Sequence, residues 1–338
     1  MKIYYDHAFP ADWITGKINR QVIDLFVSQL PDWMDDTLVM DPGYGKLDTV
    51  LSYYPDFDAK HKIAICFNDT YALCLEKADA YLGEGQYNVI SQANYQKFWY
   101  FGYTIETVMR EYKNQEFPLD YEYLFLNYNR KPKLLRVQLI DKLIDNGLND
   151  RGLYTMGVFD DGRKATNTTL MTIPENNNII HANDAKFHGI PNDITSLGNI
   201  TVWNKSFINL ISETTHNELF LSEKTVKPLV GKRPFIIDGA IGSIRLLNDL
   251  GFKTFSNYWD EGYDSAEPSS RQDMIISILV ELSKLSDNQI INMYADMKEI
   301  LDYNHTYFFN EFRIQNSNAL NDMAATYIKH YFGDTNEL

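Results

Sequence analysis

Short apolar runs alternate with helix-period patterns along the first third of the chain. The apolar runs predict strands at residues 1–6, 37–40, 50–53, 62–67 and 87–91, and the helix-period patterns predict helices at 19–29 and from Asn68 or Asp69 to residue 81. Strands followed by helices at this spacing are typical of an α/β domain with a parallel sheet. Residues 92–118 are aromatic and polar, and we interpret them as the crossing to a second domain.

A second alternation of strands and helices begins after residue 118. Its apolar runs predict strands at residues 123–126, 152–157, 207–212 and 235–237, with a short extended stretch at 199–202. Helices are expected at residues 135–144, 225–229 and 241–250. Apolar residues at positions i, i+3 and i+4 then predict a helical tail over residues 271–285, 287–303 and 308–331.

These two halves predict the organisation of the whole chain. We expect an α/β protein with two Rossmann-like domains that face a cleft, at residues 1–118 and 119–270, and a helical C-terminal segment at 271–338 that packs on them. The length of 338 residues suits two domains of ordinary size. Ligands of such sheets bind beyond the carboxyl ends of the strands, so the ligand-binding and catalytic residues are expected in the loops that follow the strands.

The distribution of charge narrows the class of ligand. A formal charge of −15 disfavours broad binding to nucleic acid, because neutralising phosphates needs clustered lysine and arginine. Two basic islands nevertheless stand in the acidic chain, and both follow predicted strands: Arg130, Lys131, Lys133 and Arg136 in the first, and Lys224, Lys227, Lys232 and Arg233 in the second. Such islands fit a small polyanionic ligand better than a long duplex.

Several classes are disfavoured by what the sequence lacks. Its two cysteines, Cys66 and Cys74, predict neither a disulfide framework nor a zinc site, so we expect a reducing compartment, the cytoplasm. The first residues lack the apolar core of a signal peptide, and no stretch approaches eighteen apolar residues, so no membrane span is expected. The sequence lacks a Walker-type loop, a GxGxxG after a strand, a GxSxG elbow and an HExxH pair. The common classes of NTPase, dehydrogenase, hydrolase and metalloprotease are therefore disfavoured.

The main candidate site lies in residues 206–237. Ser222 can cap a helix that begins at Glu223, and the free amides at a helix start favour anions. Lys224 adds a mobile positive charge suited to a diphosphate, whereas the carboxylate of Glu223 suits ribose hydroxyls. An ordinary helix cap with Lys224 in solvent explains the same local pattern, so both interpretations stay open.

Neighbouring residues extend this candidate site. Arg130 ends a strand-to-helix loop and can reach the same phosphates, and Arg136 and Lys227 are further cations of the two islands. Glu213 follows a predicted strand and can bind a sugar hydroxyl or stabilise a developing cation. The alternatives are a solvated basic helix face for the first island and an ion pair with Lys224 or Lys227 for Glu213. Because both islands fall at one predicted sheet edge, phosphate binding is favoured.

Two residues of the first domain are candidates for a proton-accepting group. His7 and Asp41 both follow predicted strands, which would place them across the cleft from the second domain. A histidine or a carboxylate there can remove the proton from an acceptor hydroxyl, and the alternative for each is a polar surface loop. The acidic, aromatic loop at residues 259–264 can hold a divalent metal or be merely solvated, and without a ligand partner elsewhere we predict no metal site.

The order of these features resembles the donor-site segment of glycosyltransferases with the two-Rossmann GT-B architecture, most closely the α1,3-fucosyltransferase family. Nine residues separate Glu213 from Glu223, and Ser222-Glu223-Lys224 is followed by a helix and by an apolar strand after Pro234. The family has Phe-Glu-Asn and Thr-Glu-Lys at the corresponding places. The longer stretches SEKTVKPLVGKRPFI and GFKTFSNYWDEGYD look like uncharacterised glycosyltransferase-like proteins of bacteriophages and large viruses. The resemblance covers roughly residues 121–265.

The resemblance implies a set of roles. Glu223 would contact the nucleotide ribose, Lys224 and Arg130 the diphosphate, and Glu213 the donor sugar, with Arg136 as a further match. It implies an inverting hexosyl- or pentosyltransferase that uses a nucleotide-diphosphate sugar as donor and needs no obligatory metal or cofactor. The base would come from the first domain, and the enzyme would act in the cytoplasm, that of the host if the protein is viral. Thr214 stands where the family has Asn, so the resemblance does not specify fucose.

Three functions stay open at this point. The first is a glycosyltransferase that acts on a glycan or another hydroxyl acceptor. The second is a viral enzyme that glycosylates hydroxymethylated bases of DNA, which would have to extrude the base and would need a basic groove that residues 1–118 do not offer. The third is a non-catalytic nucleotide- or glycan-binding module on the same scaffold.

Overall fold

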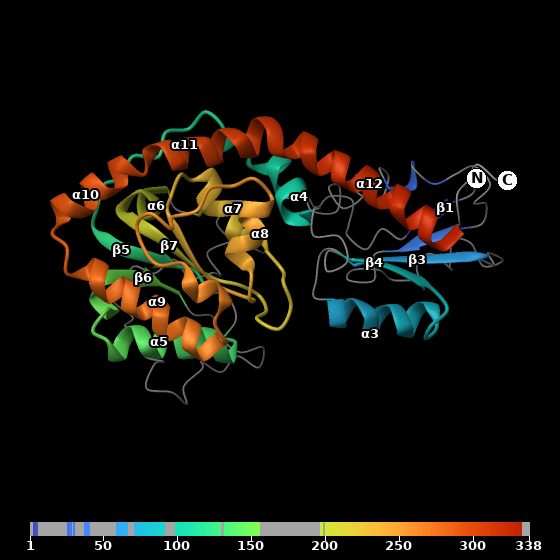
Figure 1. The fold of residues 1–338 in the computed structure, drawn as a ribbon, viewed down its shortest axis with the longest axis horizontal. Coiled ribbons are helices and arrows are strands. Elements are labelled where there is room, and N and C mark those ends of the chain that lie inside the picture. The colour runs from blue at the N-terminus through green and yellow to red at the C-terminus, as the bar shows by residue number, and fades with distance from the viewer. Residues whose placement is uncertain are drawn as a thin grey trace. The chain divides into compact units, whose positions relative to one another are not determined.

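The computed structural model describes residues 3–5, 26–28, 30, 37–40, 59–66, 71–91, 99–129, 132–155, 197–198 and 200–332. The chain divides into two compact units, residues Met1–Val108 with Glu311–Leu338, and residues Met109–Asn310. In the described part of each unit the strands form a parallel four-stranded sheet accompanied by helices, so the fold is α/β, as the sequence predicts (Figure 1). In this division residues 109–118 belong with the second unit, and the helical tail from residue 271 contributes to both units.

The first unit has the strand order β1-β2-β3-β4, and all neighbouring strands run parallel. Its strands are β1 (Ile3–Tyr5), β2 (Thr37–Met40), β3 (His61–Cys66) and β4 (Asn88–Ser91), and its helices are α3 (Tyr71–Leu82), α4 (Tyr100–Val108) and α12 (Arg313–Phe332). These four strands and α3 confirm the predicted elements. Helix α4 lies in the stretch 92–118, where no helix is predicted, and the predicted strand 50–53 lies outside the described residues.

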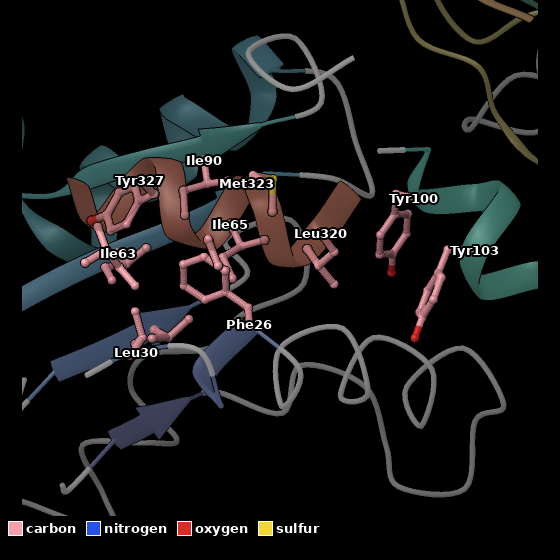
Figure 2. Packing of buried hydrophobic residues seen from close by; sticks show 13 residues of the cluster. Phe26, Leu30, Ile63, Ile65, Ile90, Tyr100, Tyr103, Leu320, Met323 and Tyr327 are labelled. Carbon is pink, nitrogen blue, oxygen red and sulfur yellow. The ribbon is translucent and has the colours of Figure 1, made fainter. Parts of the chain in front are cut away.

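Strand β3 is buried on both faces of the first sheet. Ile63 and Ile65 belong to one cluster with residues of α12 and of the segment before β2, among them Leu320, Met323, Tyr327 and Phe26 (Figure 2). The alternate residues of β3, Ala64 and Cys66, pack instead with Cys74 and Ala78 of α3. A strand covered on both faces is typical of a parallel sheet between two helical layers. The C-terminal helix α12 therefore completes the core of the first unit.

The second unit has the strand order β6-β5-β7-β8, again with every neighbouring pair parallel. Its strands are β5 (Tyr123–Asn127), β6 (Gly152–Tyr154), β7 (Ser206–Ser212) and β8 (Phe235–Asp238). Its helices are α5 (Leu134–Asp145), α6 (Ile200–Lys205), α7 (Glu223–Val230), α8 (Ser243–Asp249), α9 (Pro268–Ser283), α10 (Asp287–Asp296) and α11 (Lys298–Tyr307). The predicted strands and the helices α5, α7, α8 and α9 are confirmed.

Helices cover both faces of the second sheet. Helices α5 and α9 pack against each other on one face, and α7 and α11 pack together on the other (Figure 1). The chain passes from β5 through α5 to β6 on one side, and from β7 through α7 to β8 on the other. The direction of winding therefore reverses between β5 and β7, as in doubly wound sheets.

One predicted element of the second unit is wrong. Residues 199–202 are predicted to be extended, but α6 is a helix over Ile200–Lys205. The β-branched residues at its start favour a strand locally. Trp203 is fully buried, and its indole Nε1 donates to the carbonyl of Gly231 at 2.8 Å, an arrangement made by the helical backbone. This tertiary contact overrides the local preference.

The predicted helical tail is divided more finely in the structure. The single helix expected at residues 287–303 is two helices, α10 and α11, that meet at Met297. A capping box at Ser286 and Gln289 starts α10, and a π-helical turn at Phe308–Phe312 separates α11 from α12. Within the described ranges no helix is both long enough and apolar enough to cross a membrane.

Candidate functional site

The polar residues at the carboxyl ends of β5 and β7 form the centre of the candidate site. Ligands of doubly wound sheets bind outside the carboxyl ends of the strands, where the winding reverses. Asn127 ends β5, and its Nδ2 donates to the carbonyl of Leu210 at 2.6 Å and to Oγ of Ser212 at 3.0 Å. Asn129 is also fully buried and donates to Oδ1 of Asn127. This network fixes the ends of the two central strands against each other.

Glu213 is the first residue after β7, and its side chain is fully engaged. Only 1% of the residue is exposed, so its carboxylate needs hydrogen-bond donors to offset desolvation. Oε1 accepts from the amide of Ser222 at 3.0 Å and from Oγ1 of Thr225 at 2.6 Å, and Oε2 accepts from Oγ of Ser222 at 2.5 Å. Glu213 therefore ties the end of β7 to the start of α7. Contact between Glu213 and a donor sugar stays a prediction.

Helix α7 begins where the sequence predicts it. Ser222 is the N-cap, with φ −92° and ψ −172°, and its Oγ accepts from the amide of Lys224 at 3.3 Å. Nζ of Lys224 lies 2.8 Å from Oε1 of Glu223, 3.1 Å from Oγ of Ser222 and 3.4 Å from Oγ1 of Thr214. The side chains of Lys224 and Glu223 keep 20% and 19% of their surface exposed. Lys224 is thus held at the cap and remains accessible to a ligand.

The two basic islands meet at Thr214. Nζ of Lys133, from the first island, donates to the carbonyl of Thr214 at 2.7 Å, and Nζ of Lys224, from the second, donates to Oγ1 of the same residue at 3.4 Å. The sequence places both islands at one sheet edge, and the structure brings these two lysines to one residue. Lys133 is not singled out by its local pattern. Its position as the N-cap of α5, directly after Pro132, is the sequence feature that could have identified it as a site residue.

Arg136 and Lys227, two of the predicted site cations, are buried. Arg136 is 4% exposed, and its Nη2 donates to the carbonyls of Glu213 at 3.0 Å and Ser212 at 3.4 Å. Lys227 is 8% exposed and lies in the middle of α7. Arg136 therefore supports the end of β7. The contact of Arg136 and Lys227 with a nucleotide stays a prediction, and the predicted residues His7, Asp41 and Arg130 lie outside the described residues.

The carboxyl group of Glu223 titrates far below its usual range. Burial alone would raise its pKa, but the charge and hydrogen bond of Lys224, together with the charge of Lys227, outweigh this effect and lower the pKa to about 2. Glu223 is therefore an anion at neutral pH and can accept hydrogen bonds with either oxygen.

We expect the Glu223 carboxylate to stabilise the fold in a pH-dependent way. Its folded pKa lies below its unfolded value of 4.5, so the stabilisation is present above pH 4.5 and is lost as the pH falls toward 2. Between pH 6 and pH 3, the wild type should lose on the order of 2 kcal/mol more unfolding free energy than Glu223→Gln. Urea denaturation across this range measures it. Glu281→Gln, at an exposed pair with Lys284, serves as the control, and equal pH slopes in wild type and Glu223→Gln would contradict the expectation.

The acidic loop at residues 259–264 is built into the fold. Glu261 accepts from Oγ1 of Thr254 at 2.8 Å and from the amide of Phe255 at 2.7 Å. Asp264 accepts from the amides of Ile244 and Arg245 at 2.9 and 3.1 Å, which satisfies the start of α8. These carboxylates are occupied by backbone amides and a hydroxyl. Among the residues that the structure describes, no group of three or more His, Cys, Asp or Glu side chains could hold a metal ion.

Sequence reasoning missed a histidine–aspartate pair at the same sheet edge. Nε2 of His216, in the loop after β7, lies 3.0 Å from Oδ1 of Asp238, the last residue of β8. The other oxygen of Asp238 accepts from Nε2 of Gln272 at 2.8 Å. The side chains of His216 and Asp238 are 4% and 0% exposed. Asp238 directly follows the predicted strand 235–237 and His216 lies in the loop after the predicted strand 207–212, and these positions could have indicated the pair.

No model of a protein family matches the chain, and no curated protein matches it significantly.

Proposed function

We propose that the protein is a nucleotide-sugar glycosyltransferase of the GT-B type, with two Rossmann-like domains. It would transfer a sugar from a nucleotide-diphosphate donor to the hydroxyl of a glycan or a similar acceptor, with inversion and without an obligatory metal. The observation that carries the proposal is the convergence of Lys133 and Lys224 on Thr214, beside the start of α7 and at the carboxyl edge of a doubly wound sheet. The positive end of a helix and adjacent cations both favour a diphosphate.

Each group of the site has a role in this proposal. Lys224 and Lys133 bind the diphosphate at the positive end of α7 and stabilise the negative charge that develops on it as the glycosidic bond breaks. Arg130 is proposed to add a further cation. The anionic carboxylate of Glu223 accepts hydrogen bonds from the ribose hydroxyls. Glu213 holds the loop in place from beneath.

The transfer itself needs a base. The proton of the acceptor hydroxyl must be removed as its oxygen attacks the anomeric carbon and the diphosphate leaves. His7 and Asp41 are the residues that the sequence offers from the first domain for this step. The chemistry of the donor site does not depend on which residue serves.

Replacing Lys224 should weaken nucleotide binding specifically. Lys224→Ala is expected to raise the Kd for the nucleoside diphosphate that the protein binds by about 10- to 100-fold, because a charge-assisted hydrogen bond to phosphate contributes roughly 1.5–3 kcal/mol. Isothermal titration with UDP, GDP and their sugars measures the effect. Lys133→Ala should also raise the Kd for this nucleoside diphosphate.

Lys284→Ala is the matched control for this measurement. Lys284 is exposed and pairs with Glu281 at 2.5 Å. It follows Ser283, whose carbonyl accepts a hydrogen bond from Arg151, the residue before β6. Because β6 is the edge strand opposite β8, Lys284 lies away from the β7–α7–β8 side of the sheet. The substitution removes the same charge far from the site. Equal Kd values for the Lys224→Ala and Lys284→Ala variants would contradict the proposal, and binding without any transfer would favour a non-catalytic nucleotide-binding module.

A further inference from the structure

His216, Asp238 and Gln272 form an ordered chain of hydrogen bonds at the carboxyl edge of the second sheet. His216 comes from the loop between β7 and α7, Asp238 from the end of β8 and Gln272 from α9. Gln272 is fully buried, and its Nε2 also donates to the carbonyl of Leu135 at 2.8 Å. Asp238 therefore holds the imidazole, and Gln272 holds Asp238 in turn.

This chain of hydrogen bonds lies directly beside the proposed donor site. The amide of Glu213 donates to the backbone carbonyl of Asp238 at 2.9 Å, so the ends of β7 and β8 are locked together here. Thr214, which both site lysines contact, is two residues before His216. Lys224 contacts Thr214, so the loop that carries His216 begins at the proposed diphosphate site.

The carboxylate of Asp238 determines which nitrogen of His216 is available. A buried carboxylate that accepts from one ring nitrogen holds that nitrogen as N–H and leaves the lone pair on the other. Nε2 faces Asp238, so Nδ1 is the free acceptor, and no described residue bonds to it. The carboxylate also stabilises the imidazolium that forms when Nδ1 takes a proton.

We propose that His216 is the catalytic base of the transfer and that Asp238 is its positioning residue, an inference that rests on the proposed function. The acceptor hydroxyl gives its proton to Nδ1 of His216 as its oxygen bonds to the anomeric carbon. The bond from that carbon to the diphosphate oxygen breaks, and its electron pair leaves with the diphosphate. The imidazolium then returns its proton to water. This base lies in the donor-binding unit, unlike His7 and Asp41.

The test compares His216→Gln, Asp238→Asn and the double variant with wild type in the full chain. Release of UDP or GDP from nucleotide sugars is measured with water or a methyl glycoside as acceptor, and donor Kd is measured by titration on the same samples. His216→Gln should lower kcat by about 100-fold or more, with donor Kd within about threefold of wild type. The double variant should be no slower than His216→Gln, because Asp238 acts through His216. Added imidazole should restore part of the activity of His216→Gly.

One control variant and the possible outcomes separate a base from a structural histidine. Asn217→Ala changes the exposed neighbour in the same loop and should leave kcat within about threefold of wild type. A kcat of His216→Gln within threefold of wild type would overturn the assignment, as would equal losses in kcat and in donor affinity. A wild type that binds a nucleotide sugar but releases no nucleotide would overturn the base and leave donor binding intact. A wild type that binds no nucleotide would overturn the proposed function itself.

Discussion

Arg233→Lys is expected to lower the free energy of unfolding by about 3–5 kcal/mol, although it keeps the charge. Arg233 is 1% exposed, and burial lowers its pKa to about 10, still well above neutrality. Its guanidinium donates to carbonyls around it, those of Trp203, Ser206, Phe117, Lys232 and Pro118, and to the hydroxyl of Tyr294 at 2.7 Å. Lysine has one nitrogen and cannot reach this ring of acceptors, so several buried carbonyls would lose their partner.

Urea denaturation of Arg233→Lys measures this loss, and Arg245→Lys is its matched control. Arg245 lies on α8 and is exposed, so the same exchange there should change the unfolding free energy by less than about 0.5 kcal/mol. A loss below 1 kcal/mol in Arg233→Lys would show that the buried guanidinium does not hold residues 117–118 against the turn before β8. Arg233 thus belongs to the fold, although the sequence places it in a basic island.

Glu213→Ala is expected to cost about 3–4 kcal/mol of unfolding free energy and to abolish nucleotide binding. The substitution leaves the buried amide and hydroxyl of Ser222 and the hydroxyl of Thr225 without their shared acceptor, and each unpaired buried donor costs roughly 1–3 kcal/mol. The start of α7 would lose its attachment to β7. Lys224 would then no longer be held beside Thr214.

Chemical denaturation and nucleotide titration of one Glu213→Ala preparation separate the two effects. Glu281→Ala is the control, because the side chain of Glu281 is 72% exposed and its ion pair with Lys284 lies at the surface, so its loss should stay below about 0.5 kcal/mol. If Glu213→Ala were as stable as Glu281→Ala, the carboxylate would not organise the site. If it were unstable but bound nucleotide normally, the start of α7 would not be part of the binding site.

Much of the fold follows from the hydrophobic pattern, because parallel strands buried on both faces are short apolar runs bounded by breakers. The runs at residues 62–67, 207–212 and 235–237 predict β3, β7 and β8 on this basis alone. Helix α6 could not be predicted in this way. Its conformation depends on Trp203 reaching Gly231, a contact between residues distant in sequence.

The candidate site was predictable in part for a similar reason. Ser222 as a cap and Lys224 at the start of α7 are local features that the sequence displays. The contacts of the cations cannot be predicted from the local sequence, because they depend on which carbonyls of other elements surround each cation. Arg136 and Arg233 point at backbone oxygens of other elements, whereas Lys133 reaches Thr214 from another strand end. The pair of His216 and Asp238 likewise forms only when β7 and β8 lie side by side.

The central claim is that the start of α7 binds the diphosphate of a nucleotide sugar. Isothermal titration of the wild-type protein with UDP, GDP, ADP and CDP and with the matching monophosphates tests it most directly. We predict one binding site per chain for at least one nucleoside diphosphate, with its monophosphate bound at least about tenfold more weakly, because Lys133 and Lys224 are placed for a diphosphate. Absence of binding for every diphosphate, or equal affinity for a diphosphate and its monophosphate, would contradict the account.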